Sequence, residues 1–435
     1  MLTKELNDLV THVGLGTPGG NFMRRYWHPV SLSAEVPTGG KPKQIRILGE
    51  DLVLFRDDAG RPGLLGLHCS HRLVSLAYGR PEDGGLRCAM HGWVYDVSGH
   101  CIQQPAEPEP FTDRIQHLAY PCQDLGGLIF AYMGPPEKMP LLPRYESLVR
   151  TEGTRQVTWW PISGGYLQHL EGAWDWIHAG FLHTNNWSVK KHEMMDLPKP
   201  TVELRETQYG LRRRSEQWHP GGSTGRSYGY FFMPTGWLRL NGTWNRVQAR
   251  TDRPVIQDDI QKIQAWFVPV DDGHTLRYQA SFAPLNADGT AYQWRPDGQL
   301  LQPGADQDYG RDFYNVDSIS GIDPSTAETF RAQDTMANET QGYPAMDRSR
   351  EHLGVHDFIM TVMRMMIIRG IADAEKGLDP KNLIRDPELN ELVCIRGTEE
   401  DGTDDLEMFI AERPSVEAGG FAPRPPAART PGRVT

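Results

Sequence analysis

The sequence predicts an α+β protein of two domains, a small all-β module followed by a larger domain that mixes long strands with helices. Three observations support this prediction. The chain has 435 residues, more than a single hydrophobic core usually fills. Short alternating strands with turn signals run from residue 44 to residue 132. Beyond residue 145, stretches of helical periodicity appear between longer strand patterns.

The N-terminal stretch predicts a short helical segment. Leu2–Val13 has the periodicity of a helix and is followed by Gly14, which favours a helix end. Phe22–Trp27 is a second amphipathic patch. We therefore expect residues 1–37 to form a helical segment that packs on the larger domain.

The all-β module is expected over residues 38–145. Gln44–Leu48 and Leu52–Phe55 alternate apolar and polar residues around a Gly-Glu turn. The pattern continues to Leu128–Tyr132 and stops at Gly134-Pro135-Pro136, because proline cannot donate to a strand ladder.

The larger domain is expected over residues 146–398, followed by a tail. After Glu399 the chain is acidic and then rich in proline and alanine, a composition that predicts disorder over residues 399–435. The expected elements of the domain are the helices Gln168–His183, Arg331–Glu339 and Asp357–Ala374, the hairpin Val202–Trp218, and the strands Trp237–Arg250 and Lys262–Pro269.

The charge balance excludes one class of partner. With 45 Lys and Arg against 56 Asp and Glu, the formal net charge is −11, the reverse of what a phosphate-binding surface needs. Residues 1–13 resemble neither a signal peptide nor a transit peptide, and no stretch is long and apolar enough to span a membrane. We therefore expect a cytoplasmic protein with no nucleic-acid or membrane partner, whose five cysteines are reduced unless they bind metal.

The strongest signal is a pair of short motifs, Cys69-x-His71 and Cys88-x-x-His91. A Cys2His2 zinc finger would take two cysteines from one loop and two histidines from another. Here each loop offers one thiolate and one imidazole, which is typical of a [2Fe–2S] cluster with two cysteines on one iron and two histidines on the other. The remaining cysteines have no partner at metal spacing and are expected in the core: Cys101, Cys122 and Cys394.

A second motif, Asp175-x2-His178-x4-His183, is a candidate mononuclear iron site. Taken alone, its two histidines would be better explained as core residues, and the cluster motif in the same chain reverses that preference. In a regular helix Asp175 and His178 share a face, so the carboxylate can orient the imidazole. His178 and His183 do not share a face, so both can bind one ion only if the helix is interrupted, and Gly180 makes an interruption easy. Two imidazoles and a carboxylate form the facial triad of non-haem Fe(II) oxygenases.

The carboxylate of this triad must come from elsewhere in the chain. Asp334, in the expected helix Arg331–Glu339, is the candidate. Spacing alone does not separate it from three alternatives, Glu339, Asp347 and Asp357.

The residues around both motifs resemble the Rieske-type aromatic-ring oxygenases. His68–Arg72 and Cys88–Trp93 resemble the cluster-binding loops of that family. Residues 1–375 are similar to its phthalate-dioxygenase branch, at the stretches Gly16–Pro18, Met23–Trp27, Leu167–Gly172 and Asp347–Gly354. The resemblance implies a Rieske [2Fe–2S] domain joined to a helix-grip catalytic domain, whose curved antiparallel sheet is covered by a long helix.

The resemblance also implies roles and partners. It implies that Asp334 binds the mononuclear Fe(II), and that Asp175 bridges a cluster histidine of one subunit to an iron histidine of its neighbour. It implies a homotrimer, or a multiple of trimers. Because nothing in the chain matches a nicotinamide or flavin site, a separate NAD(P)H-dependent reductase of the flavin and ferredoxin type must supply electrons.

The expected function is therefore that of a terminal oxygenase in aromatic catabolism, which uses O2 and NAD(P)H-derived electrons to hydroxylate an aromatic, carboxylated substrate. One alternative is an O-demethylase of a methoxylated, lignin-derived aromatic acid with the same iron site. An alternative of another class is a non-catalytic Rieske electron-transfer protein, which would not need His178, His183 and Asp334. A further alternative is a zinc-binding scaffold, which would be colourless.

The substrate pocket is less well specified by the sequence. Four aromatic residues flank the iron histidines and are candidates for its walls or for ordinary core: Trp174, Trp176, Phe181 and Trp187. Two arginine pairs share a strand face and offer a carboxylate site or a solvated face: Arg212 with Arg214, and Arg246 with Arg250.

Overall fold

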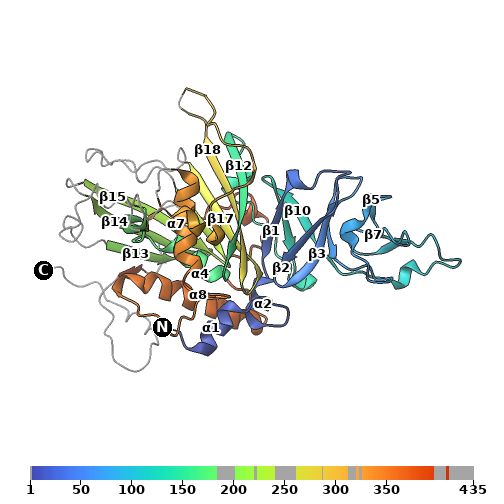
Figure 1. Cartoon of the computed structure of the whole chain (residues 1–435), viewed down its shortest axis with the longest axis horizontal. Coiled ribbons are helices and arrows are strands. Elements are labelled where there is room, and N and C mark those ends of the chain that lie inside the picture. The colour runs from blue at the N-terminus through green and yellow to red at the C-terminus, as the bar shows by residue number, and fades with distance from the viewer. Residues whose placement is uncertain are drawn as a thin grey trace.

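The computed structural model describes residues 2–183, 201–219, 223–240, 261–286, 288–311, 320–322, 326–395 and 408–410. Figure 1 shows an elongated molecule with an all-β lobe at one end of its long axis and a larger lobe of strands and helices at the other. The described helices are α1 (Lys4–Thr11), α2 (Pro18–Met23), α3 (Glu146–Val149), α4 (Tyr166–Trp174), α5 (Ala179–Leu182), α7 (Ala327–Glu339) and α8 (Phe358–Glu375). No helix among the described residues is long and apolar enough to cross a bilayer.

The all-β lobe consists of three antiparallel sheets with the strand orders β1-β11-β10, β2-β3-β4-β9 and β5-β6-β7-β8. Their strands are β1 (Trp27–Leu32), β2 (Lys43–Ile47), β3 (Glu50–Arg56), β4 (Pro62–Gly66), β5 (Arg80–Glu82), β6 (Gly85–Arg87), β7 (Val94–Asp96), β8 (Cys101–Gln103), β9 (Ala119–Tyr120), β10 (Cys122–Leu125) and β11 (Leu128–Tyr132).

Strand β3 separates two hydrophobic cores. Leu52 and Leu54 belong to the main core, which continues into the larger lobe. Val53 and Phe55 belong to a second core that also contains Cys69. Because alternate side chains of a strand point to opposite faces, the part of β3 that is covered on both sides, Leu52–Phe55, is continuously apolar.

The larger lobe is built on a nine-stranded sheet in the order β19-β12-β18-β17-β16-β15-β14-β13-β20, with antiparallel neighbours except for the parallel pair β12 and β19. Helix α4 packs on β15, β16 and β17, and α7 lies beside β12. The remaining strands are β12 (Gly153–Ser163), β13 (Thr201–Glu206), β14 (Gly210–His219), β15 (Ser223–Phe232), β16 (Gly236–Leu240), β17 (Lys262–Asp271), β18 (His274–Pro284), β19 (Gly298–Gln299) and β20 (Met408–Ile410). The predicted α+β class is therefore confirmed.

Several predicted elements agree with the structure and three differ. The hairpin over Val202–Trp218 is β13 and β14, and β11 has the predicted bounds. The expected continuous helix Gln168–His183 is wrong, since α4 ends at Trp174 and α5 begins at Ala179. Met408–Ile410, inside the tail expected to be disordered, instead pairs with β13.

The third difference concerns the start of the chain. Strand β1 lies within residues 1–37, for which only a helical segment was expected, and it pairs with β11 of the all-β lobe. Helices α1 and α2 do pack beside α8 in the larger lobe (Figure 1). The N-terminal segment thus contacts both lobes. Beyond β20, the rest of the predicted tail lies outside the described residues, as do residues 241–250 of the expected strand Trp237–Arg250.

A buried ion network anchors α4. The Glu171 carboxylate accepts hydrogen bonds from Arg348 Nη2 at 2.9 Å and from Arg364 Nε at 2.6 Å. Arg348 also donates to Asn7 of α1 at 3.2 Å, so the network ties three parts of the chain together. Although burial opposes ionisation, the two arginines lower the pKa of Glu171 to about 2. The C-terminal end of α4, which leads to Asp175, is therefore held in place.

Candidate metal centres

The two Cys/His loops have the same backbone design. In the first loop the Cys69 N–H donates to Val74 O at 2.9 Å, and Leu73 N–H donates back to Cys69 O at 2.9 Å. In the second loop Cys88 N–H donates to Trp93 O at 2.8 Å, and Gly92 N–H donates to Cys88 O at 3.1 Å.

The fifth position of both loops is left-handed, with φ 61° at Leu73 and φ 76° at Gly92. The chain therefore turns back at the same position after the cysteine in both loops.

The four predicted cluster residues come together at the tips of these loops. Cys69 and Cys88 are buried, and the rings of His71 and His91 lie 4.5 Å apart nearer the surface. His71 stacks on Trp93 at 4.6 Å, and its buried Nδ1 has no hydrogen-bond partner among the described residues. A buried ring nitrogen without a hydrogen-bond partner is free to bind a metal ion, so the residues fit the cluster.

The sequence interpretation assigned no role to Tyr95, which lies near the first loop. The Tyr95 hydroxyl lies 3.2 Å from Cys69 Sγ, and its ring packs against His117. The His117 ring lies 2.7 Å from Ser70 Oγ and 2.8 Å from Gly66 O, which supports the loop from behind. The sequence signal for Tyr95 was its place in strand β7, directly after the second loop.

The second predicted centre is also brought together. The nearest ligand atoms of His178, His183 and Asp334 all lie within 4.8 Å of one another. His183 Nε2 is 2.9 Å and His178 Nε2 is 3.5 Å from Asp334 Oδ1. Although partial burial opposes ionisation, the two imidazoles hold the pKa of Asp334 well below its ordinary value. The donor set and its spacing fit a 2-His-1-carboxylate iron site.

The chain conformation between α4 and α5 allows both histidines to reach one point. Asp175 has extended backbone angles of φ −61° and ψ 142°, and its Oδ1 accepts the Ile177 N–H at 2.9 Å. This side-chain turn ends α4 before His178, which then precedes α5. The interruption expected at Gly180 therefore occurs at Asp175 instead, because an aspartate can replace the missing helical hydrogen bond.

Gln333, which the sequence interpretation missed, orients His183. Its Nε2 donates to Ile322 O at 2.7 Å, so its Oε1 is turned toward His183 Nδ1 at 2.8 Å. Since an amide oxygen only accepts, Nδ1 carries the proton and Nε2 is free to bind metal. Phe330 stacks on the same ring at 3.7 Å. The available signal was the position of Gln333 next to Asp334 in a helix.

Asp175 lies near Nδ1 of the His178 ring, whereas Asp334 lies near Nε2 of the same ring. The Asp175 Oδ2 lies 3.8 Å from His178 Nδ1, beyond a direct hydrogen bond, and the Asp175 side chain is 34% exposed. Although burial opposes protonation, Asp334 and Asp175 together raise the pKa of His178.

The three alternative carboxylates are engaged elsewhere. Glu339 accepts from Ser163 N–H at 2.8 Å and from the Tyr309 hydroxyl at 3.0 Å. Asp347 accepts from Ser349, and Asp357 accepts from the Gly354 N–H. Among the described residues, only Asp334 joins the two histidines in such a group.

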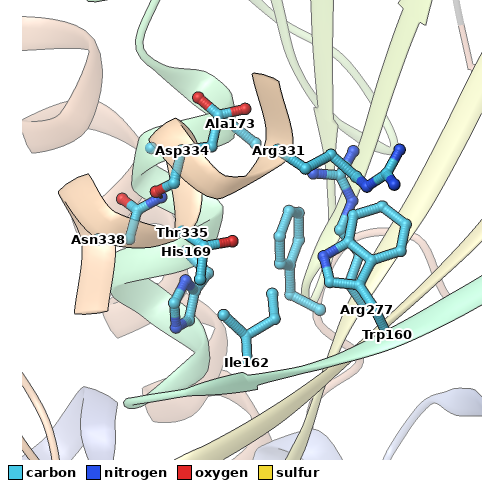
Figure 2. Close-up of a pocket in the computed structure, with 11 residues that line it drawn as sticks. Trp160, Ile162, His169, Ala173, Arg277, Arg331, Asp334, Thr335 and Asn338 are labelled. Atoms are coloured by element: carbon cyan, nitrogen blue, oxygen red, sulfur yellow. Dashed lines mark hydrogen bonds between the residues drawn. The ribbon is translucent and has the colours of Figure 1, made fainter. Parts of the chain in front are cut away.

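A cavity of about 420 Å³ opens beside the triad. Its aromatic wall is formed by Trp160, Trp176, Tyr228, Trp237 and Phe330. Its charged groups are Arg213, Arg239, Arg277, Arg331, Asp175 and Asp334. A smaller cavity of about 30 Å³ adjoins it, and Figure 2 shows the side chains around that space, including Trp160, Arg277 and Arg331.

The predicted lining residues are only partly right. Trp176 lines the cavity, but Trp174 is buried in the core and Phe181 is exposed. Arg212 and Arg214 are not among the lining residues, whereas Arg213 between them is. The other candidates lie outside the described residues: Trp187, Arg246 and Arg250.

Comparisons with known proteins agree with this geometry. Residues 26–121 match the Rieske [2Fe-2S] domain family. The chain is 30% identical over 433 residues to the 5,5'-dehydrodivanillate O-demethylase oxygenase subunit of Sphingobium sp. (strain SYK-6), covering 97% of this chain and 91% of that protein. It is 31% identical over 407 residues to the phthalate 4,5-dioxygenase oxygenase subunit of Pseudomonas putida, covering 87% of this chain and 88% of that protein.

A solved structure supports the fold. Dicamba monooxygenase bound to dicamba matches with a TM-score of 0.60 at 14% identity, over 82% of this chain and 99% of that chain.

The fold, the paired Cys/His loops and the triad define a Rieske-type non-haem iron oxygenase, and the chain belongs to that family. Within the family it is an oxygenase alpha subunit of the phthalate-dioxygenase-like branch. Its cofactors are a Rieske [2Fe–2S] cluster and a mononuclear non-haem iron, as predicted.

Proposed function

We propose that this oxygenase hydroxylates an aromatic acid bound in the cavity beside the triad. The observation that carries the proposal is the lining of that cavity, which combines aromatic rings with four arginines. Planar rings pack on aromatic walls, and guanidinium groups bind carboxylates through paired hydrogen bonds. The two relatives are named for dehydrodivanillate and phthalate, which are both aromatic carboxylates.

The proposed ligands of the cluster are Cys69 and Cys88 on one iron and His71 and His91 on the other. The buried thiols, the outward imidazoles and the unpartnered His71 Nδ1 support this assignment. The proposed ligands of the mononuclear iron are His178, His183 and Asp334. When bound, the cluster supplies single electrons and the Fe(II) ion binds and activates O2.

The chain's own residues prepare the mononuclear centre. Gln333 keeps His183 in the tautomer whose Nε2 faces Asp334. The turn at Asp175 brings His178 to the same point. The aromatic walls around the cavity limit the access of water to the reacting carbon.

We propose that Asp175 links the two centres across a head-to-tail homotrimer, or a multiple of it. Figure 1 has the cluster loops, next to β5 and β7, in the all-β lobe, whereas the iron ligands lie in the larger lobe, on α7 and at the two ends of α5, the short helix that follows α4. A neighbouring subunit must therefore bring its cluster to the Asp175 side of the iron site. The partly exposed Asp175 carboxylate is available to a histidine of that subunit.

The domain division that accompanies this proposal is a cluster domain over residues 38–145, a catalytic domain over residues 146–398, and an N-terminal segment that braces the catalytic domain. The packing of α1 and α2 beside α8 supports the last part.

The family requires a reductase or ferredoxin as electron donor, and we propose an NAD(P)H-dependent reductase of the flavin and ferredoxin type. The cytoplasmic location stays a prediction from the sequence.

O-demethylation of a methoxylated aromatic acid is the second candidate reaction. The relative from Sphingobium favours it, whereas the relative from Pseudomonas favours ring hydroxylation. The same residues serve both, because the outcome depends on which carbon the cavity holds beside the iron. A non-catalytic electron carrier is disfavoured, since it would need neither the triad nor the cavity.

The test combines metal analysis with O2 uptake. Anaerobically prepared protein should contain about three irons and two sulfides per chain, and His178→Ala should lose about one iron while the cluster absorbance stays. O2 uptake is then measured with a surrogate reductase and a panel of benzoates, phthalates and methoxybenzoates. Formaldehyde release would identify O-demethylation, and hydroxylated rings would identify ring oxygenation. Two irons in both proteins after Fe(II) addition would contradict the proposal.

A further inference from the structure

Arg277 lies in the cavity on a platform of aromatic rings. Its guanidinium carbon is 4.6 Å from the ring centre of Trp160, 5.1 Å from that of Phe267 and 5.4 Å from that of Trp237. Its Nη2 donates to Gln279 at 3.2 Å, and its buried Nε has no partner among the described residues. The aromatic faces stabilise the cation without neutralising it.

Arg331 approaches the same tryptophan from α7. Its guanidinium carbon is 5.9 Å from the Trp160 ring centre, and its side chain is 17% exposed. Its Nη2 donates to Leu301 O at 3.2 Å, and its buried Nε likewise lacks a partner within the described part of the chain. Its nearest carboxylate, Glu328, is 3.8 Å away, but Arg295 holds Glu328 at 2.5 Å.

Both guanidinium groups therefore lie beside one indole. The carboxylate that acts on Arg277 is Asp334, and the one beside Arg331 is Glu328, which is shared with Arg295. Figure 2 shows Arg331 reaching from the helix and Arg277 from the sheet toward the ring of Trp160. Burial lowers the pKa of Arg277 to about 10, which leaves this group charged at neutral pH, and burial also lowers the pKa of Arg331. Two like charges held together in a partly dry site favour an anion between them.

Arg213, another arginine of the cavity, has different surroundings. Arg213 is buried, donates to Trp174 O and lies 5.3 Å from the Trp174 ring, beside the turn at Asp175. Burial lowers its pKa, and Asp175 is the carboxylate that opposes this shift. Arg213 thus supports the chain turn before His178.

We propose that Arg277 and Arg331 form the carboxylate-binding subsite of this oxygenase, with the substrate ring lying along Trp160 toward the iron ligands. This inference rests on the proposed function and names the residues that select its substrate. Arg331 and Asp334 are three residues apart on one face of α7, so their Cα atoms are about 4.5 Å apart along the helix axis. The carboxylate is held away from the iron, and a ring carbon or methoxy group distal to it faces the iron.

The test is equilibrium binding, measured by calorimetry under anaerobic conditions on the iron-loaded protein. The probes are benzoate, phthalate, 4-methoxybenzoate and 3-methoxybenzoate, each paired with its uncharged amide. In the unaltered protein at least one acid should bind about ten- to hundredfold more tightly than its amide. Arg277→Gln and Arg331→Gln should each remove most of that difference by weakening the acid and leaving the amide unchanged.

Arg350→Gln is the matched control, because Arg350 is exposed and is not among the cavity residues. Iron content and the cluster absorbance of each variant report whether the fold is intact. If both arginine variants lost iron, Arg277→Lys and Arg331→Lys would be measured instead. They keep the charge but not the paired N–H donors, so each should lose part of the acid preference. Equal binding of all four acids and their amides to the unaltered protein would overturn the proposal, and so would an acid preference that survives in both arginine variants.

Binding and turnover separate this inference from the proposed function. An acid preference that depends on Arg277 and Arg331, without any O2 uptake, would leave the subsite standing and refute the reaction. O2-dependent turnover of an acid that binds equally well to the unaltered protein and to both arginine variants would support the reaction and refute the subsite.

Discussion

The loops that carry Cys69, His71, Cys88 and His91 differ from the triad of His178, His183 and Asp334 in how much of the chain each needs. Each loop closes on itself through two backbone hydrogen bonds between residues four or five apart. The triad instead depends on contacts such as that of His183 with Gln333, which are 150 residues apart. A local motif thus forms the cluster site, whereas the packing of α4 against α7 forms the iron site. Damage to that packing should empty one site and spare the other.

The largest effect is expected at the carboxylate of the triad. Asp334→Asn removes the negative ligand, so we expect loss of the mononuclear iron and a fall in turnover of about a thousandfold or more, with the cluster absorbance unchanged. Iron and sulfide analysis and O2 uptake measure this. Asp347→Asn, at an exposed carboxylate that accepts from the backbone N–H and the hydroxyl of Ser349, should behave like the unaltered protein. The reverse result for the two variants would show that the wrong ligand is assigned.

The next largest effect should follow from loosening α4. Glu171→Gln leaves Arg348 without its buried carboxylate and leaves Arg364 with Glu351 alone, which we expect to cost about 3–5 kcal/mol of unfolding free energy. Denaturant unfolding measures this cost, with the exposed Glu137→Gln as control. The mononuclear iron should be lost at lower denaturant than the cluster, and simultaneous loss of both would contradict the contrast drawn between the sites.

The same residue predicts a dependence on pH. The pKa of Glu171 falls from an ordinary 4.5 to about 2 in the fold, so its contribution is complete above pH 4.5 and declines as the pH falls toward 2. Glu171→Gln should flatten this part of the acid unfolding curve. A curve with the same slope in variant and unaltered protein would mean that another group controls it.

A moderate effect is expected when the hydrogen bond that orients His183 is removed. Gln333→Leu removes the acceptor of the Nδ1 proton, and we expect the affinity for Fe(II) to fall about ten- to hundredfold. An Fe(II) titration of the iron-depleted protein checks this. Gln333→Glu keeps an acceptor oxygen and should restore most of the affinity. If both variants bound Fe(II) like the unaltered protein, the hydrogen bond would be incidental.

The smallest effect tests the local design of the cluster loops. Gly92→Ala introduces a Cβ at φ +76° that would meet Pro105 Cγ at 2.9 Å. Gly84→Ala has nearly the same φ, +78°, with no atom of the described residues within 4 Å. Thermal unfolding should show a loss of about 1–2 kcal/mol for Gly84→Ala and a larger loss for Gly92→Ala. Equal losses would mean that Pro105 moves aside without cost.

The sequence alone determined the fold class, most strand and helix positions, and the identity of the candidate ligands at both centres. These features depend on short-range patterns. Alternation places strands such as β2, and one thiolate beside one imidazole in each loop points to a two-iron cluster. Asp334 was singled out by resemblance, since spacing alone left Glu339, Asp347 and Asp357 open.

Tertiary structure decided the rest because these features depend on which segments pack together. The chain turn lies at Asp175 and not at Gly180, because a side-chain hydrogen bond to Ile177 competes with the helix. Gln333 orients His183 only once α7 packs beside α4. The cavity takes Arg213 instead of Arg212 and Arg214, since a strand directs neighbouring side chains to opposite faces and only packing determines which face is enclosed.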